Sequence, residues 1–237
     1  MLEGLEYQIR VSGRARYARI VVRRDMSVEV VLPQGFHTGQ AEALLREKEP
    51  WLTRTLDRFR VHAPLKQDQY QNSRPERISF ESVGLEFSIT YHKTDSSQVR
   101  VSGRGSELRI SGRVDDPLKL NMALQRWLKQ KGKALLPPIL EAESRRLGMN
   151  CHKVSVRLQK RCWGSCSRKK TVSLNAKLLF LPQAVMRYVM IHELAHLKEM
   201  NHSQAFWALV KRYDENASEH RRQLKQASRW IPVWADR

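Results

Sequence analysis

The sequence contains few cysteines and no long hydrophobic segment. Its three cysteines among 237 residues are an odd number and too few for a disulfide framework. No stretch approaches the ~18 apolar residues that a membrane-spanning helix requires. The first seven residues also lack the basic and apolar regions of a secretory signal. We therefore expect a cytoplasmic protein with reduced thiols and no membrane partner.

Acidic and aromatic residues are also scarce relative to basic residues. The chain has 24 Asp and Glu against 43 Lys and Arg, which gives a net charge of +19 and a pI near 10.4. Such an excess attracts nucleic acid, acidic surfaces or anionic lipid without identifying which. The basic residues form short, separate clusters, such as Arg221-Arg222, and no aromatic residues interleave with them as in a base-stacking surface. A basic solvated surface and a nucleic-acid partner both remain open.

Hydrophobic residues in the first third of the chain recur with a period of two. They predict strands at residues 7–11, 18–22 and 28–32. Thr38 is then a candidate N-cap, because hydrophobic residues over 41–59 follow at helical spacing. Pro50 predicts either a kink or the start of a second helix. The polar composition of residues 61–76 predicts a linker or a long loop.

Strands resume after this polar segment. The same periodicity predicts them at residues 78–82, 85–91, 99–102 and 108–111. Gly103 and Gly105 mark a hairpin turn between the last two. Asp116-Pro117 then has the composition of a helix start. We expect Pro137-Pro138 to interrupt this helix, and a second segment to end at Gly148.

The last ninety residues mix short strands with helices. Residues 154–158 and 172–174 are predicted strands, and residues 178–181 form a short buried run. Pro182 opens the next helix. Asn201 turns the chain, Ser203 caps a further helix that extends to Tyr213, and a basic helix covers about 217–230. The chain as a whole is therefore predicted to be an α+β protein.

The strongest chemical signal is the sequence His192-Glu193-Leu-Ala-His196. Residues i and i+4 of a helix lie on one face, so both imidazoles can reach one metal ion at ~2.0–2.1 Å. Glu193 is rotated about the helix axis and can approach a metal-bound water without being a ligand. Zinc lowers the pKa of that water, and Glu193 then takes its proton as the general base. The motif therefore predicts zinc-dependent hydrolysis.

A third ligand is needed, and His202 is the first candidate. It follows His196 by six residues, a spacing that suits a helix that ends and a chain that turns back to the metal. Glu199, Glu215 and Glu219 are the alternatives, since a glutamate from a following helix can also serve. Three protein ligands leave the fourth position to water, which is typical of a catalytic rather than a structural site.

The segment Trp163-Gly-Ser-Cys166 predicts a tight turn between strands. In one interpretation, the segment forms a wall or a substrate-binding edge of the cleft. In the other, Trp163 anchors the core and Cys166 is a small buried hydrophobic residue. A second zinc site made by Cys151, His152, Cys162 and Cys166 matches no common spacing. Tyr188 and Tyr213 are candidates for stabilising an oxyanion, although core packing also accounts for Tyr188.

These motifs together resemble the YgjP-like metallopeptidase family. The resemblance rests on four segments: Tyr188–Trp207, Trp163–Cys166, Ser173-Leu-Asn175 and Leu135-Leu-Pro-Pro138. The N-terminal strands and Glu49-Pro-Trp51 are more weakly similar. One departure is Cys162, which stands directly before Trp163, where family members usually have an arginine.

The resemblance implies a zincin-like metal domain related to the WLM and SprT-like proteases. Its metal would be Zn²⁺, with His192, His196 and His202 as ligands and Glu193 as the catalytic acid/base. We therefore expect two domains: a strand-rich region with one helix over 1–115, and a helical zincin-like domain with a small antiparallel sheet over 116–237.

The predicted function is a zinc metallopeptidase that hydrolyses protein or peptide substrates. The WLM and SprT-like relatives are associated with cleaving proteins crosslinked to DNA, and the net charge of +19 is compatible with a nucleic-acid partner. The alternative is a basic nucleic-acid-binding protein with a structural or vestigial zinc site.

Overall fold

The computed structural model describes residues 6–22, 27–37, 39–62, 74–160 and 162–235, with the backbone alone at 58–62. It divides the chain into two compact units, Met1–Gln71 and Asn72–Arg237. Thr38 and most of the linker expected at 61–76 lie outside the described residues.

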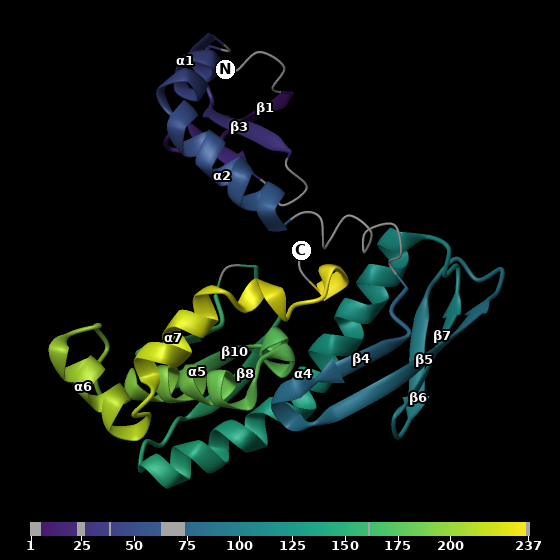
Figure 1. Cartoon of the computed structure of the whole chain (residues 1–237), viewed down its shortest axis with the longest axis vertical. Coiled ribbons are helices and arrows are strands. Elements are labelled where there is room, and N and C mark those ends of the chain that lie inside the picture. Colours follow the sequence, from purple (N-terminus) through teal and green to yellow (C-terminus); the bar gives the residue numbers. More distant parts are fainter. Residues whose placement is uncertain (1–5, 23–26, 38, 63–73, 161, 236–237) are drawn as a thin grey trace. The chain divides into compact units, whose positions relative to one another are not determined.

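The first unit contains a three-stranded sheet and two helices, which can be followed in Figure 1. Its elements are β1 (Tyr7–Ser12), β2 (Arg19–Val22), β3 (Val28–Pro33), α1 (Gly39–Glu47) and α2 (Glu49–His62). The three expected strands are thus confirmed, and Pro50 lies at the start of a second helix. A small core, formed by six buried residues, packs β3 against both helices; these are Val28, Val30, Leu32, Ala41, Leu45 and Leu52.

The second unit contains two sheets, four α-helices and several short 3₁₀ helices. Its strands are β4 (Arg77–Phe80), β5 (Leu85–Lys93), β6 (Arg100–Arg104), β7 (Glu107–Gly112), β8 (Lys153–Arg157), β9 (Gly164–Cys166) and β10 (Thr171–Asn175). Its helices are η1 (Glu81–Val83), α4 (Pro117–Leu147), η2 (Ala176–Phe180), α5 (Gln183–Ala195), α6 (Gln204–Tyr213), α7 (Ala217–Lys225), η3 (Ala227–Arg229) and η4 (Val233–Ala235).

One arrangement of three strands occurs in all three sheets. The third strand of each set lies in the centre, parallel to the first and antiparallel to the second, in the orders β1-β3-β2, β5-β7-β6 and β8-β10-β9. β4 is added beside β5. The sheet next to the metal motif is therefore mixed, which corrects the antiparallel sheet expected from the sequence.

The prediction of a tight turn at Trp163–Cys166 was wrong, because residues 164–166 form the strand β9. Cys166 pairs with Val172 and Gly164 with Leu174. The chain instead turns just after β9, where the Lys170 amide donates to the Ser167 carbonyl at 2.9 Å and Lys170 has a φ of 54°. β10 is the only strand that the described structure pairs with β9, so β9 is an edge strand.

The long helix α4 begins and ends as its sequence predicts. The Asp116 carboxylate accepts hydrogen bonds from the amides of Leu118 and Lys119, both at 3.1 Å. Gly148 ends the helix with a φ of 62°. The interruption expected at Pro137-Pro138 was wrong, because α4 is continuous through both prolines. Buried leucines on either side of them pack into the core, and this packing offsets the two missing backbone hydrogen bonds.

A single core joins the sheet β4–β7 to the helices of the second unit. The Phe80 ring of β4 lies 5.4 Å from the Trp127 ring of α4 and 5.4 Å from the Phe180 ring of η2. The Ser82 hydroxyl of η1 donates to the Leu179 carbonyl at 3.1 Å. The structural division at 71 and 72 therefore differs from the boundary at 115 and 116 expected from the sequence.

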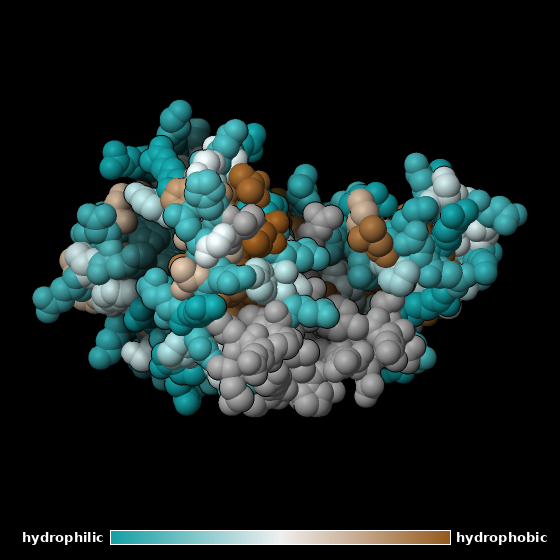
Figure 2. Space-filling view, turned by 90° about the horizontal axis from the view of Figure 1, so that it is seen from above, coloured by the Kyte–Doolittle hydropathy of each residue, from teal (hydrophilic) through white to brown (hydrophobic). Residues whose placement is uncertain are grey.

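The surface of the described residues is mainly polar. On the face shown in Figure 2, hydrophobic residues form small groups among hydrophilic ones. None of the described helices has the length and apolar composition needed to cross a membrane.

Candidate metal centre

Helix α5 presents two histidines and one glutamate at its C-terminal end. The helix follows Pro182 and is buried along most of its length, as its apolar sequence predicts. His192 and Glu193 lie in its last turn, and His196 is its C-cap with a φ of −64°. Only 6% of Glu193 and 9% of His196 are exposed. The motif is therefore held by a core helix rather than by a surface loop.

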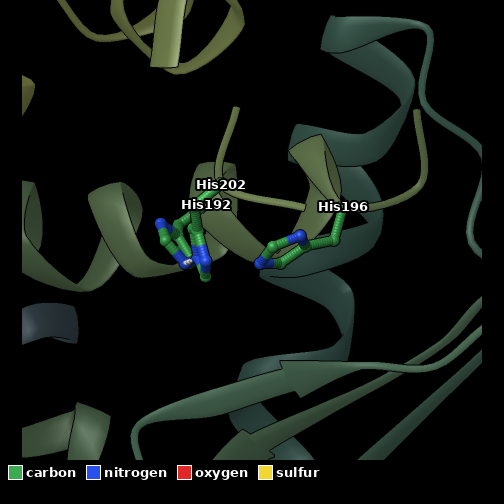
Figure 3. Close-up of side chains that lie close together, drawn as sticks. All are labelled: His192, His196 and His202. Carbon is green, nitrogen blue, oxygen red and sulfur yellow. Dashed lines mark hydrogen bonds between the residues drawn. The ribbon is translucent and has the colours of Figure 1, made fainter. Parts of the chain in front are cut away.

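The third histidine comes from the short connection between α5 and α6. The Ser203 amide donates to the Asn201 carbonyl at 2.8 Å, and the Ser203 hydroxyl accepts from the Phe206 amide at 3.2 Å. This turn and cap bring His202 Nε2 to 3.1 Å from His192 Nε2. In Figure 3 the rings of His192, His196 and His202 point toward a common space. Their nitrogen ligand atoms all lie within 4.8 Å of one another.

This donor set fits a zinc ion. Two nitrogens bound to one tetrahedral zinc lie about 3.3 Å apart, close to the separation between His192 and His202. His196 Nδ1 lies 3.0 Å from the Glu199 carbonyl, so its Nε2 is left for the metal. Within the described residues this is the only group of three or more His, Cys, Asp or Glu side chains with metal-ligand spacing. The described structure therefore contains no second site around Cys151 and Cys166.

The alternative glutamate ligands are engaged elsewhere or lie outside this group. Glu199 contacts His196 through its backbone carbonyl, and its carboxylate is not part of the described metal-ligand group. The Glu219 carboxylate accepts hydrogen bonds from Arg222 at 2.8 Å and from Gln223 at 2.9 Å. Glu215 is exposed. The geometry thus brings together the three histidines that the sequence favoured.

Burial sets the charges of the centre. Burial, together with the neighbouring His196 and His202, lowers the pKa of His192 to about 4. Burial also lowers the pKa of His196. A neutral imidazole is the form that binds a metal. Burial raises the pKa of Glu193 to about 7, a value suited to proton transfer near neutral pH.

The edge strand β9 lies directly against Glu193. A Cβ atom added to Gly164 would stand 2.6 Å from Glu193 Cγ and 2.7 Å from Glu193 Oε1, so a larger residue would displace the carboxylate. The sequence signal for this contact is a glycine within a strand, which often marks a close approach. Sequence reasoning instead assigned Gly164 to a turn and missed the contact.

A cavity of about 600 Å³ opens beside the metal centre. It is lined by Trp163, Gly164, Tyr188, Val189, His192, Glu193, His202, Trp207, Arg221, Leu224 and Lys225. Trp163 serves both of its expected roles, because it lines the cavity and packs against the core. Cys166 is only partly buried and packs against the core, and burial raises the pKa of its thiol to about 11.

The two candidate tyrosines have different surroundings. Tyr188 lines the cavity and is also a core residue, 3% exposed. The Tyr213 hydroxyl instead donates to the Leu147 carbonyl at 3.5 Å, and Tyr213 is not part of the cavity lining. Sequence reasoning gave no role to the cavity residues Arg221 and Lys225, which α7 contributes.

One family model and two solved structures are similar to this chain. The family model "YgjP-like, metallopeptidase domain" matches residues 16–227. The metallopeptidase zymogen abylysin of Pyrococcus abyssi is 30% identical with a TM-score of 0.37, covering 42% of this chain and 100% of its own. Jannalysin of Methanocaldococcus jannaschii, also a metallopeptidase zymogen, is 24% identical with a TM-score of 0.34, covering 38% of this chain and 92% of its own. No curated protein matches significantly. Because the family model spans most of its length, the chain belongs to the YgjP-like metallopeptidase family.

Proposed function

We propose that this metallopeptidase uses zinc held by His192, His196 and His202, with Glu193 as the general base. The observation that carries the proposal is the convergence of three imidazoles beside a buried carboxyl group. The centre also lines a cavity large enough for part of a peptide.

The protein groups have distinct tasks in peptide hydrolysis. When bound, zinc supplies a Lewis acid that lowers the pKa of a coordinated water and polarises the peptide carbonyl. Glu193 accepts the proton of the attacking water and later donates it to the leaving amine nitrogen. Its raised pKa suits both transfers, because the carboxyl group gains and loses a proton near neutral pH.

The edge strand β9 supports an extended substrate beside the centre. Its outer edge has no strand partner in the described structure, so its backbone groups can pair with a peptide in extended conformation. Gly164 brings this edge into contact with Glu193. The backbone of a peptide paired with β9 would therefore lie next to Glu193, the proposed general base. This position suits cleavage of a main-chain peptide bond.

The proposal is tested by comparing zinc-loaded wild type with Glu193→Gln on a mixture of peptides from a denatured protein, read by mass spectrometry. We expect both proteins to hold about one zinc per chain. Cleavage by Glu193→Gln should fall about 10²–10⁴-fold, because a general base typically contributes this much. Glu215→Gln is the matched control, since Glu215 is exposed and outside the cavity lining. Equal cleavage by wild type and Glu193→Gln would contradict the role of Glu193.

A second candidate is a nucleic-acid-binding protein with a structural zinc ion, favoured by the net charge of +19. It predicts DNA binding that weakens steeply as salt is raised and that Glu193→Gln leaves unchanged. A protease activated by DNA combines both candidates and predicts faster cleavage when DNA is added. A cytoplasmic location is proposed for either, on the basis of three unpaired cysteines.

A further inference from the structure

Two basic side chains of α7 face the same cavity as the metal centre. Arg221 and Lys225 are four residues apart, so they lie on one side of the helix, and both line the cavity. Among the described residues that line the cavity, Glu193 is the only acidic one. The cavity wall therefore carries more positive than negative charge.

Two acidic residues near α7, Glu219 and Asp214, have other partners. Glu219 is hydrogen-bonded to Arg222 and Gln223, and the Asp214 carboxylate lies 2.7 Å from His220 Nδ1. The described structure shows no carboxylate within ion-pair distance of Arg221 or Lys225. The two cations are thus available to a negatively charged group that enters the cavity.

Aromatic contacts hold Arg221 close to the metal centre. Its guanidinium carbon lies 4.5 Å from the Trp207 ring, and the Trp207 ring is stacked on the His202 ring with centroids 5.5 Å apart. The guanidinium is therefore no farther from the His202 ring than the sum of these two distances. This span is comparable to that of two or three residues of an extended peptide. The stacking also restricts the guanidinium, which lowers the entropy lost when it binds a ligand.

We propose that Arg221 and Lys225 bind a carboxylate group of the peptide substrate close to the bond that is cleaved. This inference rests on the proposed peptidase function and adds a preference for acidic substrates. A planar guanidinium matches a carboxylate with two hydrogen bonds, and Lys225 adds a second positive charge. Trp163, Val189 and Leu224 add apolar surface to the same cavity, against which the rest of the peptide can pack. The carboxylate belongs either to an Asp or Glu side chain or to the C-terminus of the peptide.

Binding is measured first, with zinc-loaded Glu193→Gln protein that leaves the peptides intact. The first series consists of fluorescein-labelled peptides with an amidated C-terminus and an otherwise neutral sequence. Each peptide carries Asp, Asn or Lys at one position, and the position of this residue differs from peptide to peptide. A second series compares a free with an amidated C-terminus. In one of the two series, we expect the peptide with the carboxylate (Asp, or the free C-terminus) to bind about tenfold more tightly than the matching peptide with an amide.

Variants assign this preference to the two cations. Adding Arg221→Ala and Lys225→Ala to the Glu193→Gln protein should bring the ratio between carboxylate and neutral peptides close to one. Arg221→Glu should reverse the preference toward the Lys peptide. Arg222→Ala is the matched control, because Arg222 pairs with Glu219 on the same helix and does not line the cavity. It should keep the tenfold ratio.

The outcomes separate this inference from the proposed function. A preference in the first series assigns the carboxylate to an acidic side chain, and a preference in the second assigns it to the C-terminus. Equal binding of all peptides overturns the inference, even where the wild-type protein cleaves them. An Arg221→Ala change that weakens cleavage of Asp and Asn peptides by the same factor also overturns it, because Arg221 would then act on the reaction rather than on a carboxylate. Failure of wild type to cleave any peptide contradicts the proposed function instead.

Discussion

The strands β5–β7 with α4 and the strands β8–β10 with α5 share one arrangement, yet only the second set carries the metal centre. Each set places its third strand in the centre and follows it with a helix. The central strands differ in burial: β7 alternates between exposed and buried residues, whereas four of the five residues of β10 are buried. The site is therefore associated with a strand that is covered on both faces.

The segment that leads into β9 is hydrogen-bonded to the end of β10. The Asn175 side-chain amide donates to the carbonyls of Gln159 at 3.0 Å and Cys162 at 2.8 Å, and the Asn175 backbone amide donates to the Trp163 carbonyl at 2.9 Å. These bonds fix the chain just before Gly164, which contacts Glu193. The shared strand arrangement thus contributes to the metal centre only in the set whose edge strand is held against Glu193.

The metal centre belongs to the second region, and the largest expected effect is the loss of zinc affinity in His202→Ala. Loss of a partner that merely orients a ligand costs 10–100-fold in metal affinity, so loss of a ligand should weaken zinc binding by more than about 100-fold. Elemental analysis and competition with a chelator measure this change. His152→Ala is the control, because His152 is exposed next to β8 and outside the histidine group. Zinc affinity that is unchanged in His202→Ala would move the third ligand to another residue.

Smaller effects, on cleavage or on stability, are expected when a glycine of an edge strand is replaced by alanine. A Cβ at Gly164 would meet the flexible carboxylate of Glu193, whereas a Cβ at Gly103 in β6 would overlap the Glu107 backbone carbonyl. Gly164→Ala should therefore displace Glu193 and lower cleavage about 10²-fold while zinc is retained. Gly103→Ala should destabilise the fold by about 1–3 kcal/mol, because the backbone cannot move aside without strain.

Thermal unfolding and cleavage rates, measured on both glycine variants, separate the two effects. Gly39→Ala is a further control, since a Cβ there meets no atom within 4 Å. If Gly164→Ala cleaves as fast as wild type, the contact between β9 and Glu193 has no role in the reaction.

The features that could be predicted from the sequence are those encoded by neighbouring residues. The spacing of His192 and His196 on one helix, the caps at Asp116 and Ser203, and the alternating strands all follow from local periodicity. The position of His202 also follows from a short turn. The structure places each of these elements close to its predicted residues.

The features that could not be predicted depend on contacts between distant segments. Gly164 meets Glu193 across 29 positions of sequence, and Arg221 reaches the cavity because α7 packs on α5. No local pattern distinguishes Arg221 from its neighbour Arg222, which pairs with Glu219 instead. The continuity of α4 through Pro137 and Pro138 likewise depends on core packing that local propensity does not contain.

The smallest expected effect concerns two buried serines, Ser173 in β10 and Ser82 in η1. The Ser173 hydroxyl of β10 is buried without a hydrogen-bond partner in the described structure, whereas the Ser82 hydroxyl, which follows β4, donates to the Leu179 carbonyl at 3.1 Å. Removing an unpaired buried hydroxyl relieves a desolvation cost, so Ser173→Ala should leave the free energy of unfolding unchanged or raise it by up to about 1 kcal/mol. Ser82→Ala removes a made hydrogen bond and should lower the free energy of unfolding by about 1 kcal/mol. Urea unfolding measures both values. A clear loss of stability in Ser173→Ala would show that its hydroxyl has a partner, such as a buried water, and that the second face of β10 is less dry than its burial indicates.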